Sequence, residues 1–227
     1  MDILVAIPLV CIVIGIGLGY AHILPPMVGW AISALGILFG FGVSIFIFLA
    51  HVRVGDMHLL GYAILAALPF IVAVPMVIKD LRYPRINDVT TDLVDPPSFQ
   101  AALAARANIG RNMAYPAPFI AIMRAGYPHV QPLILDEPPS AVMQRAAALI
   151  ADQPNWVVGH RDAATLEGAV TTSVFRFVDD YVIRITAQDG KTRVDMRSKS
   201  RDGLVDAGAN ARRILSFFAQ LEQVTGR

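Results

Sequence analysis

The chain has 227 residues and is almost neutral, with 19 Lys and Arg, 18 Asp and Glu, and a formal net charge of +1. That balance argues against nucleic acid as a partner, because proteins that bind duplexes usually present a basic surface. Cys11 is the only cysteine, which excludes an intrachain disulfide framework and a cysteine-based zinc site.

The charged residues are distributed unevenly along the chain. Of all the Lys, Arg, Asp and Glu side chains, only Asp2, Arg53 and Asp56 precede residue 79. We interpret this boundary as a change of solvent from lipid to water. It predicts a three-helix transmembrane region (residues 1–78), a proline-rich strap (residues 79–139) and a soluble α+β domain (residues 140–227).

Three apolar runs, residues 3–24, 28–50 and 59–78, reach the length of about 20 residues that a spanning helix needs. None contains Asp, Glu, Lys or Arg, which argues against an ion or proton pathway through them. The pattern predicts a multi-pass protein of the cell membrane, the inner membrane of a bacterium, with membrane lipid around its helices.

Two pairs of glycines, Gly15 with Gly19 and Gly36 with Gly40, have the small-xxx-small spacing that lets helices approach closely in lipid. One interpretation is docking on a larger membrane complex or a homo-oligomer. The other, which we favour, is packing among the three helices of this chain.

The basic residues at the helix ends bear on sidedness. Lys79, Arg82 and Arg85 follow the third run, whereas Arg53 alone lies between the second and the third. Because cytoplasmic flanks tend to carry the excess of Lys and Arg, this count favours a cytoplasmic domain.

Nine of the 15 prolines lie in residues 83–139. Proline fixes its own φ and disfavours helix at the residue before it, so we expect a long strap over the domain surface. A short helix is expected from Asp95, with Pro96 in its first turn, to Arg106. A second helix is expected over residues 140–151, from its apolar periodicity.

The next stretch has the alternation of strands, over residues 156–159 and 165–171, followed by a hairpin over residues 181–198. Asp189-Gly190 is a typical two-residue hairpin turn. Pairing outward from that turn opposes apolar residues on one face and opposite charges on the other. The predicted pairs are Ile185 with Val194, Ile183 with Met196, and Arg184 with Asp195.

The chain ends in an amphipathic pattern after Asp206, a suitable helix N-cap. Its apolar stripe consists of Ala207, Ala211, Ile214, Phe218 and Leu221, widened by Leu215 and Phe217. A helix of this kind after an antiparallel sheet predicts an α+β domain in which helices pack on the sheet. We expect a cleft between that helix and the sheet.

The candidate binding residues surround the end of the hairpin and the start of the terminal helix. Arginine, hydroxyl and amide groups there, with the free N–H groups of a helix start, suit a phosphate, sulfate or carboxylate. The candidates are Arg197, Ser198, Ser200, Arg201, Asn210 and Arg213. The favoured alternative is structural pairing of these groups with Asp179, Asp180 and Asp206.

Other polar residues are weaker candidates. Asp179 and Asp180 are adjacent in a strand and point to opposite faces, so they do not form a paired carboxylate site. His160 has no nucleophile elbow, H-E-x-x-H motif or phosphate-binding loop beside it. A cation site over residues 87–92 is less favoured than local capping. We therefore predict no catalytic residue, no metal site and no cofactor.

Three segments resemble one family. They are Phe-Val-Asp-Asp at residues 177–180, Arg-Ser-Lys-Ser-Arg at 197–201, and Asp-Ala-Gly-Ala-Asn-Ala-Arg-Arg-Ile at 206–214. In order and spacing they resemble the domain of unknown function 1499, in a membrane-bound branch that lacks the paired cysteines of many relatives. The resemblance implies no reaction, ligand or partner. Because many relatives look exported, it implies a periplasmic domain, to which we lean against the charge count.

Two functions follow as predictions. The first is a non-catalytic, membrane-anchored accessory protein that contacts a partner. The alternative is a module that binds a lipid or an anionic small molecule in the helix–sheet cleft, with Arg197 or Arg201 at its mouth. A hydrolase is the third candidate.

Overall fold

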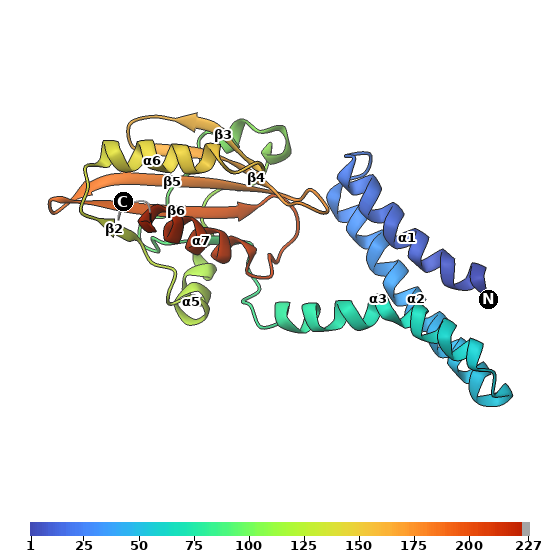
Figure 1. Cartoon of the computed structure of the whole chain (residues 1–227). Helices are drawn as coiled ribbons and strands as arrows, with labels where there is room; N and C mark the ends of the chain where they lie inside the picture. Colours follow the sequence, from blue (N-terminus) through green and yellow to red (C-terminus); the bar gives the residue numbers. More distant parts are fainter. Residues whose placement is uncertain (224–227) are drawn as a thin grey trace. The chain divides into compact units, whose positions relative to one another are not determined.

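The computed structural model describes residues 1–223. The chain divides into two compact units (Figure 1). One unit comprises residues Met1–Arg82 with the short segment Ser173–Arg176. The other comprises Tyr83–Thr172 and the chain from Phe177 onward.

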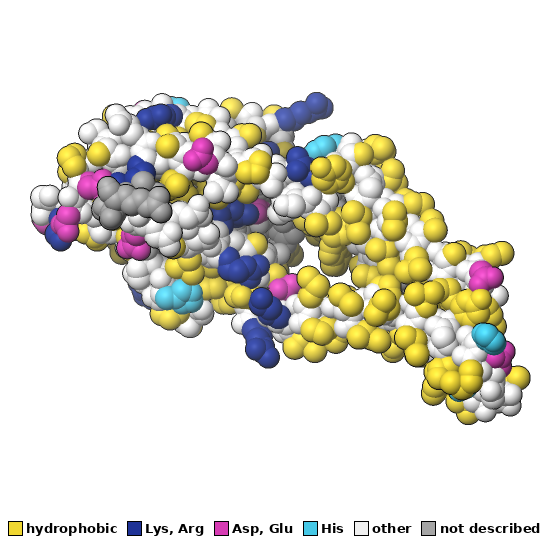
Figure 2. Space-filling model, in the orientation of Figure 1, with side chains coloured by type: hydrophobic (Ala, Val, Ile, Leu, Met, Phe, Trp, Pro, Cys, Tyr) yellow, Lys and Arg dark blue, Asp and Glu magenta, His cyan; other side chains and the backbone are white. Residues whose placement is uncertain are grey.

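The first unit consists of three apolar helices, α1 (Asp2–Tyr20), α2 (Pro26–Val54) and α3 (Met57–Asp80). All three are long and apolar enough to cross a membrane, and hydrophobic side chains dominate their surface (Figure 2). The second helix runs four residues beyond the predicted end. It stops where Gly55 takes a left-handed conformation with φ of 73°, which favours glycine at a helix end.

The glycines of the two predicted pairs lie at helix contacts inside this unit. A Cβ at Gly15 would lie 2.6 Å from the carbonyl oxygen of Gly29, and one at Gly36 would lie 2.9 Å from that of Pro8. A Cβ at Gly40 would lie 3.1 Å from the carbonyl oxygen of Ala66, whereas one at Gly19 would have ordinary van der Waals contacts of 3.7–3.8 Å. Only residues without a side chain permit such close backbone approach, so this spacing is used within the chain.

Buried hydroxyl groups add hydrogen bonds between these helices. The Ser33 hydroxyl donates to the carbonyl of Ile12 at 3.1 Å, and the Ser44 hydroxyl donates to that of Ala63 at 2.8 Å. These bonds link α2 to α1 and to α3, and they satisfy polar groups that would be costly in an apolar surrounding.

The second unit is built on a six-stranded antiparallel sheet with the order β1-β6-β5-β4-β3. The strands are β1 (Asp88–Thr90), β2 (Leu133–Leu135), β3 (Trp156–Arg161), β4 (Thr165–Thr171), β5 (Val178–Gln188) and β6 (Lys191–Ser200). The two short strands β1 and β2 pair with different parts of β6.

The hairpin register predicted from the turn is confirmed. Ile185 pairs with Val194, and Arg184 pairs with Asp195, while Ile183 pairs with Met196. Asp189 and Gly190 have φ angles of 51° and 78°, as a primed turn with two positive φ values requires. The strands continue beyond the predicted ends, so that Asp179 pairs with Ser200.

The prediction of a surface strap is wrong for much of its length. Its residues supply β1, β2 and the unpredicted helix α5 (Ala117–Gly126). Pro116 is the N-cap of α5 and Pro118 lies in its first turn, where the missing N–H costs nothing. Prolines that suggested an extended strap therefore mark a helix start.

The predicted helix between Asp95 and Arg106 is also corrected. Only α4 (Ala101–Ala104) and the single turn η1 (Arg106–Asn108) are helical there. The N–H groups of Gln100, Ala101 and Ala102 donate to the carboxylate of Glu167 on β4 at 2.7–3.0 Å. A distant side chain thus sets the start of α4, which no local pattern encodes.

Helices α6 (Pro139–Ala151) and α7 (Ala209–Gln223) cover one face of the sheet (Figure 1). This interface is the main core, and the predicted stripe of the terminal helix lies in it from Ala211 onward. Ala207, the first predicted member, precedes α7 with φ of 51°. Its buried members on α7 are Ala211, Ile214, Phe217, Phe218 and Leu221. From the sheet, Tyr181, Ile183, Ile185, Val194 and Met196 face them. The predicted packing of helices on an antiparallel sheet is confirmed.

The opposite face of the sheet is polar and is covered by the segment from Leu93 to Tyr115, which includes α4 and η1. Its small apolar cluster contains Phe99, Ala102, Met113 and Val182. Charged side chains of β5 and β6 occupy most of the remaining area. The candidate site lies on this face.

Candidate functional site

The six predicted binding residues do not form one cluster, because β6 continues to Ser200 and successive side chains of a strand alternate between faces. Ser198 and Ser200 point toward α7. Arg197 points to the polar face under residues 93–115, and Arg201 contacts Asp180 on that face. The motif therefore serves two separate networks.

The network on the α7 side is a chain of buried hydrogen bonds. Ser198 donates to Asn210 Oδ1 at 2.7 Å and accepts from Arg213 Nη1 at 2.8 Å. Asn210 Nδ2 donates to Ser200 Oγ at 3.1 Å, and Arg213 forms an ion pair with Asp179. These groups satisfy one another, which joins the start of α7 to the end of the hairpin.

The Asp206 side chain accepts hydrogen bonds from the backbone at the start of α7. The N–H groups of Gly208 and Asn210 both donate to its carboxylate at 2.9 Å. The helix itself begins at Ala209, and Ala207 and Gly208 have positive φ, so Asp206 caps the helix start from two residues before the N-cap, rather than at the N-cap position that was predicted for it. Burial raises the pKa of this carboxyl, while those two N–H donors oppose the rise. Asp206 is thus held by backbone donors rather than by one of the candidate arginines.

Arg197 lies on the polar face and is 1% exposed. Its Nε and Nη2 donate to the two oxygens of Asp88 at 2.9 and 2.8 Å. It also donates to the carbonyls of Pro97 at 3.2 Å and Met113 at 2.9 Å. The guanidinium thus fastens the edge strand β1 and two points of the covering segment to β6.

The other basic residues of this end of β6 are also paired. Lys199 Nζ donates to Asp88 Oδ2 at 2.9 Å, so one buried carboxylate serves two cations. Arg201 binds both oxygens of Asp180 at 2.6–3.0 Å. Asn108 of η1 donates to the same carboxylate at 2.8 Å, which ties the covering segment to β5.

A second ion-pair group lies further along the same face. Arg184 and Arg193 both contact Asp195 and Asp92 at 2.9–3.2 Å. Burial disfavours the ionised form of Asp92, but the N–H groups of Asp95 and Val94 and the two arginines outweigh it and lower its pKa. The Arg184–Asp195 pair was predicted from the register; the contribution of Asp92 was not.

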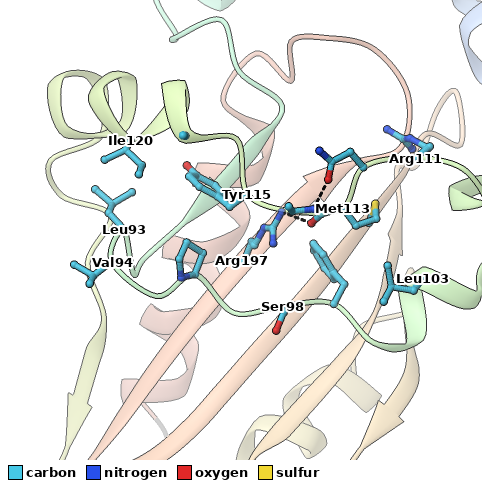
Figure 3. A pocket seen from close by; sticks show the side chains of 14 residues that line it. Leu93, Val94, Ser98, Leu103, Arg111, Met113, Tyr115, Ile120 and Arg197 are labelled. Carbon is cyan, nitrogen blue, oxygen red and sulfur yellow. Dashed lines mark hydrogen bonds between the residues drawn. The ribbon is translucent and has the colours of Figure 1, made fainter.

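A pocket of about 600 Å³ opens between the covering segment and this face (Figure 3). Most of its lining is apolar. The apolar members are Leu93, Val94, Pro96, Phe99, Leu103, Met113, Ala114, Ala117 and Ile120; the polar ones are Ser98, Arg111, Asn112, Tyr115 and Arg197. The volume lies within the range of about 300–1,000 Å³ that small-molecule sites occupy.

The floor of the pocket is formed around Arg197, whose guanidinium carbon lies 4.7 Å from the centre of the Phe99 ring and 5.2 Å from that of Tyr115. Burial raises the pKa of the Tyr115 hydroxyl above its ordinary value, and the charge of Asp88 acts in the same direction. The Tyr115 hydroxyl donates to the carbonyl of Asp88 at 3.5 Å.

This pocket is not the cleft expected between the terminal helix and the sheet. There the core is filled, and a smaller hollow of about 210 Å³ lies beside Trp156, Arg213 and Phe217. Arg197 and Arg201 lie on the other face of the sheet, because each follows the alternation set by β6. The open space is on the face covered by loops.

The remaining candidates lie outside the pocket. His160 is on edge strand β3, and its Nε2 lies 3.2 Å from the carboxylate of Asp162. Residues 87–92 contain β1, and Asp92 caps the N–H groups of Val94 and Asp95 at 2.9 Å. Within residues 1–223, no three His, Cys, Asp or Glu side chains are grouped as metal ligands.

The roles of three residues on this face were missed by sequence reasoning: Glu167, Arg111 and Asp88, the last of which is predicted only within the segment 87–92 as part of a cation site or a local cap. Each acts through partners far away in the chain; Asp88 and Arg197, for example, are 109 positions apart. One signal in the sequence could have indicated part of this face, namely the hairpin register. When it is continued outward from the turn, it places Lys199 opposite Asp180. It carried no information about β1.

Two solved structures are similar to part of the chain. CalU16 from Micromonospora echinospora is 12% identical, with 40% of this chain and 72% of that one covered and a TM-score of 0.29. TTHA0849 from Thermus thermophilus is 13% identical, with 41% and 86% covered and a TM-score of 0.22. Likenesses this weak carry no argument about fold or function.

No curated protein matches the chain. A family model described as "Protein of unknown function (DUF1499)" matches residues 88–221. The match begins at β1 and ends in α7, and it includes all three segments that carry the resemblance. Because it spans more than half of the 227 residues, the chain belongs to the DUF1499 family.

Proposed function

We propose that this protein is a membrane-anchored, non-catalytic binding module that takes a small, largely apolar molecule in the pocket between residues 93–115 and the polar face of its sheet. The observation that carries the proposal is the pocket itself, with its volume of about 600 Å³ and its mainly apolar lining. Sites for small molecules are typically concave and apolar, with a few placed polar groups.

The exposure of the lining supports this function. Val94 is 92% exposed and Leu103 is 54% exposed, although both are apolar, whereas Phe99 and Met113 further in are buried. A ligand that reaches from the rim to these rings would remove apolar surface from water, at roughly 25 cal/mol per Å². The pocket is thus suited to a molecule with a sizeable hydrocarbon part.

The helices α1 to α3 support the membrane anchor. They have 19, 29 and 24 residues. At a rise of about 1.5 Å per residue, α2 and α3 exceed the hydrocarbon core of about 30 Å, and α1 comes close to it. In this proposal the protein lies in the bacterial inner membrane, with lipid around the helices and the domain on the periplasmic side.

The test of binding uses the full-length protein in lipid nanodiscs. We expect native mass spectrometry of gently purified protein to reveal a bound amphiphile. A tryptophan at Ala117 should occupy part of the pocket and displace the ligand. The matched control is Ala125→Trp, since Ala117 and Ala125 are both exposed alanines of α5 but only Ala117 lines the pocket. Equal occupancy in the two variants, or no ligand in the wild type, would refute binding in this pocket.

Sidedness is tested with a single cysteine in a Cys11→Ser background. Gln188, at the exposed end of the hairpin, is a better labelling position than the buried Ser198. Labelling by an impermeant maleimide once the outer membrane is opened supports a periplasmic domain. Labelling only after the inner membrane is permeabilised supports the cytoplasmic side and the count of basic residues.

An accessory role in a larger membrane complex stays a prediction. Its strongest argument was the glycine spacing, which this chain uses for its own helix contacts, so a partner would have to use another face of the helices. A native pull-down that recovers the same membrane partner from wild type and Ala117→Trp protein would favour this role over ligand binding.

A further inference from the structure

Two arginines line the pocket, and they differ in how many of their donors are already used. A guanidinium carries five N–H donors. Arg197 makes four hydrogen bonds, two of them to the Asp88 carboxylate. Its charge is therefore balanced by a buried partner, and its donors hold β1 and the covering segment in place.

Arg111 is in the opposite situation. Its Nη1 donates to Asn108 Oδ1 at 3.1 Å and its Nη2 donates to the carbonyl of Ser200 at 3.3 Å. Both acceptors are neutral, and no carboxylate among the described residues forms an ion pair with Arg111. The side chain is partly exposed, so its charge and its remaining N–H donors are accessible from the pocket.

The position of Arg111 gives the pocket a polarity. Figure 3 shows Arg111 at one end and Leu93, Val94 and Ile120 at the other, with Arg197 between them. An apolar molecule alone would leave the cation at one end unpaired. A ligand with a hydrocarbon part and an anionic end matches both ends at once.

We infer that the ligand of this pocket is an anionic amphiphile and that Arg111, not the buried Arg197, is the residue that selects for its negative group. The inference rests on the proposed function and adds the ligand class and the residue that determines specificity. Arginine suits this role because its planar donors match carboxylate, sulfate and phosphate oxygens in pairs. A carboxylate serves as the test anion for all three groups in the experiment.

The experiment compares two probes with hydrocarbon chains of the same length, one with an anionic head group (dodecanoate) and one with a neutral head group (dodecanol), each carrying a photoactivatable diazirine in its chain. Full-length protein in nanodiscs of neutral lipid is irradiated with either probe, and the labelled peptides are mapped by mass spectrometry. Mapping separates probe bound in the pocket, on peptides within residues 93–120, from probe dissolved in the lipid around the helices. Unlabelled dodecanoate serves as competitor to measure affinity.

We expect dodecanoate to label the pocket peptides more strongly than dodecanol in the wild type. Arg111→Gln should lower the affinity for dodecanoate by about tenfold to a hundredfold, the factor for losing a hydrogen bond to a charged group. The affinity for dodecanol should stay nearly unchanged. Arg111→Lys should keep part of the preference. The control is Arg106→Gln, since Arg106 is an exposed arginine of the same segment that does not line the pocket.

Each other result overturns a defined part of the argument. Equal labelling by both probes in the wild type removes the anionic end and leaves the proposed binding function standing. A preference for dodecanoate that persists in Arg111→Gln assigns selection to another donor and overturns the role of Arg111. Absence of pocket labelling by either probe overturns the proposed function and this inference together. Thermal unfolding of each variant checks that loss of labelling is not loss of fold.

Discussion

The two faces of the sheet are stabilised in different ways. Under α6 and α7, apolar side chains interlock in a continuous core. Under residues 93–115, an irregular segment is fastened by single groups, such as Asp88 on Arg197 and Glu167 on α4. Regular helices fill the space above a sheet, whereas a loop held at a few polar points leaves space between them, and the pocket is there.

The two faces should respond differently to single substitutions. On the helical face, stability is shared among many contacts. Truncation of one side chain should therefore lower the free energy of unfolding in proportion to the volume removed. On the loop face, each buried charge holds several partners, so the loss of one carboxylate leaves cations without compensation. Substitutions on the two faces therefore distinguish these two kinds of stabilisation.

Removal of Asp88 should have the largest effect. Asp88→Ala leaves Arg197 and Lys199 buried without their shared carboxylate, which typically costs about 3–5 kcal/mol. Chemical denaturation followed by tryptophan fluorescence measures the free energy of unfolding. Asp136→Ala, which removes an exposed partner of Lys191, is the control and should change little. If Asp88→Ala lowers the free energy of unfolding as little as the control does, the ion pairs of Asp88 do not stabilise this face.

On the helical face, Ile214→Ala should destabilise by about 2–5 kcal/mol, because Ile214 is fully buried between α7 and the sheet. Ile214→Val, which removes one methyl group, should cost about 0.5–1.5 kcal/mol. The same denaturation measurement applies. Pocket labelling by dodecanoate should persist in folded Ile214→Ala protein; its loss would mean that the two faces are coupled more closely than their contacts indicate.

Glu167→Gln tests how the covering segment is held. The amide keeps one acceptor oxygen for three backbone donors, so one buried N–H loses its partner at a cost of about 1–3 kcal/mol. Hydrogen exchange at Gln100 to Ala104 should accelerate while the core of α7 stays protected. Glu222→Gln, at an exposed position of α7, is the matched control. Uniform acceleration over the domain would contradict a local role.

The smallest effect concerns pH and Asp206. Because burial raises its pKa above 3.8 in the folded protein, the folded state holds this proton more tightly than the unfolded one. Asp206 therefore makes stability fall as pH rises from 3.8 through the folded pKa. Asp206→Asn keeps one acceptor oxygen for the two N–H donors, so the slope of stability against pH, not the absolute stability, is the quantity to compare, and Asp206→Asn should remove that part of the slope. Parallel pH–stability curves would contradict this sign.

The outcome for the binding motif illustrates what could be predicted. Strand alternation predicts opposite faces for Asp179 and Asp180, and the structure has them there, with Arg213 and Arg201 as their partners. The same alternation puts Arg197 and Ser198, both within the predicted hairpin, on opposite faces, which conflicts with a single shared site. The two further residues of the strand add Ser200 to the face of Ser198.

The pocket was beyond such reasoning. Its walls come from segments rich in proline, where no period identifies a helix or a strand, and the helix α5 begins among prolines that suggested an extended chain. Arg111 carried no motif at all. Its importance depends on an absence, that of a carboxylate partner among the described residues, which becomes visible only when the surrounding chain is in place.

By itself the sequence determined the elements that depend on local periodicity: three apolar helices, the Asp189-Gly190 hairpin with its register, and the amphipathic terminal helix. These patterns repeat over neighbouring residues, so they can be read without knowing the fold. Only the tertiary structure decided which face carries the pocket, which arginine is already paired and which edge strand holds the partner carboxylate. Those facts depend on contacts across as many as 111 positions, and such contacts have no local pattern.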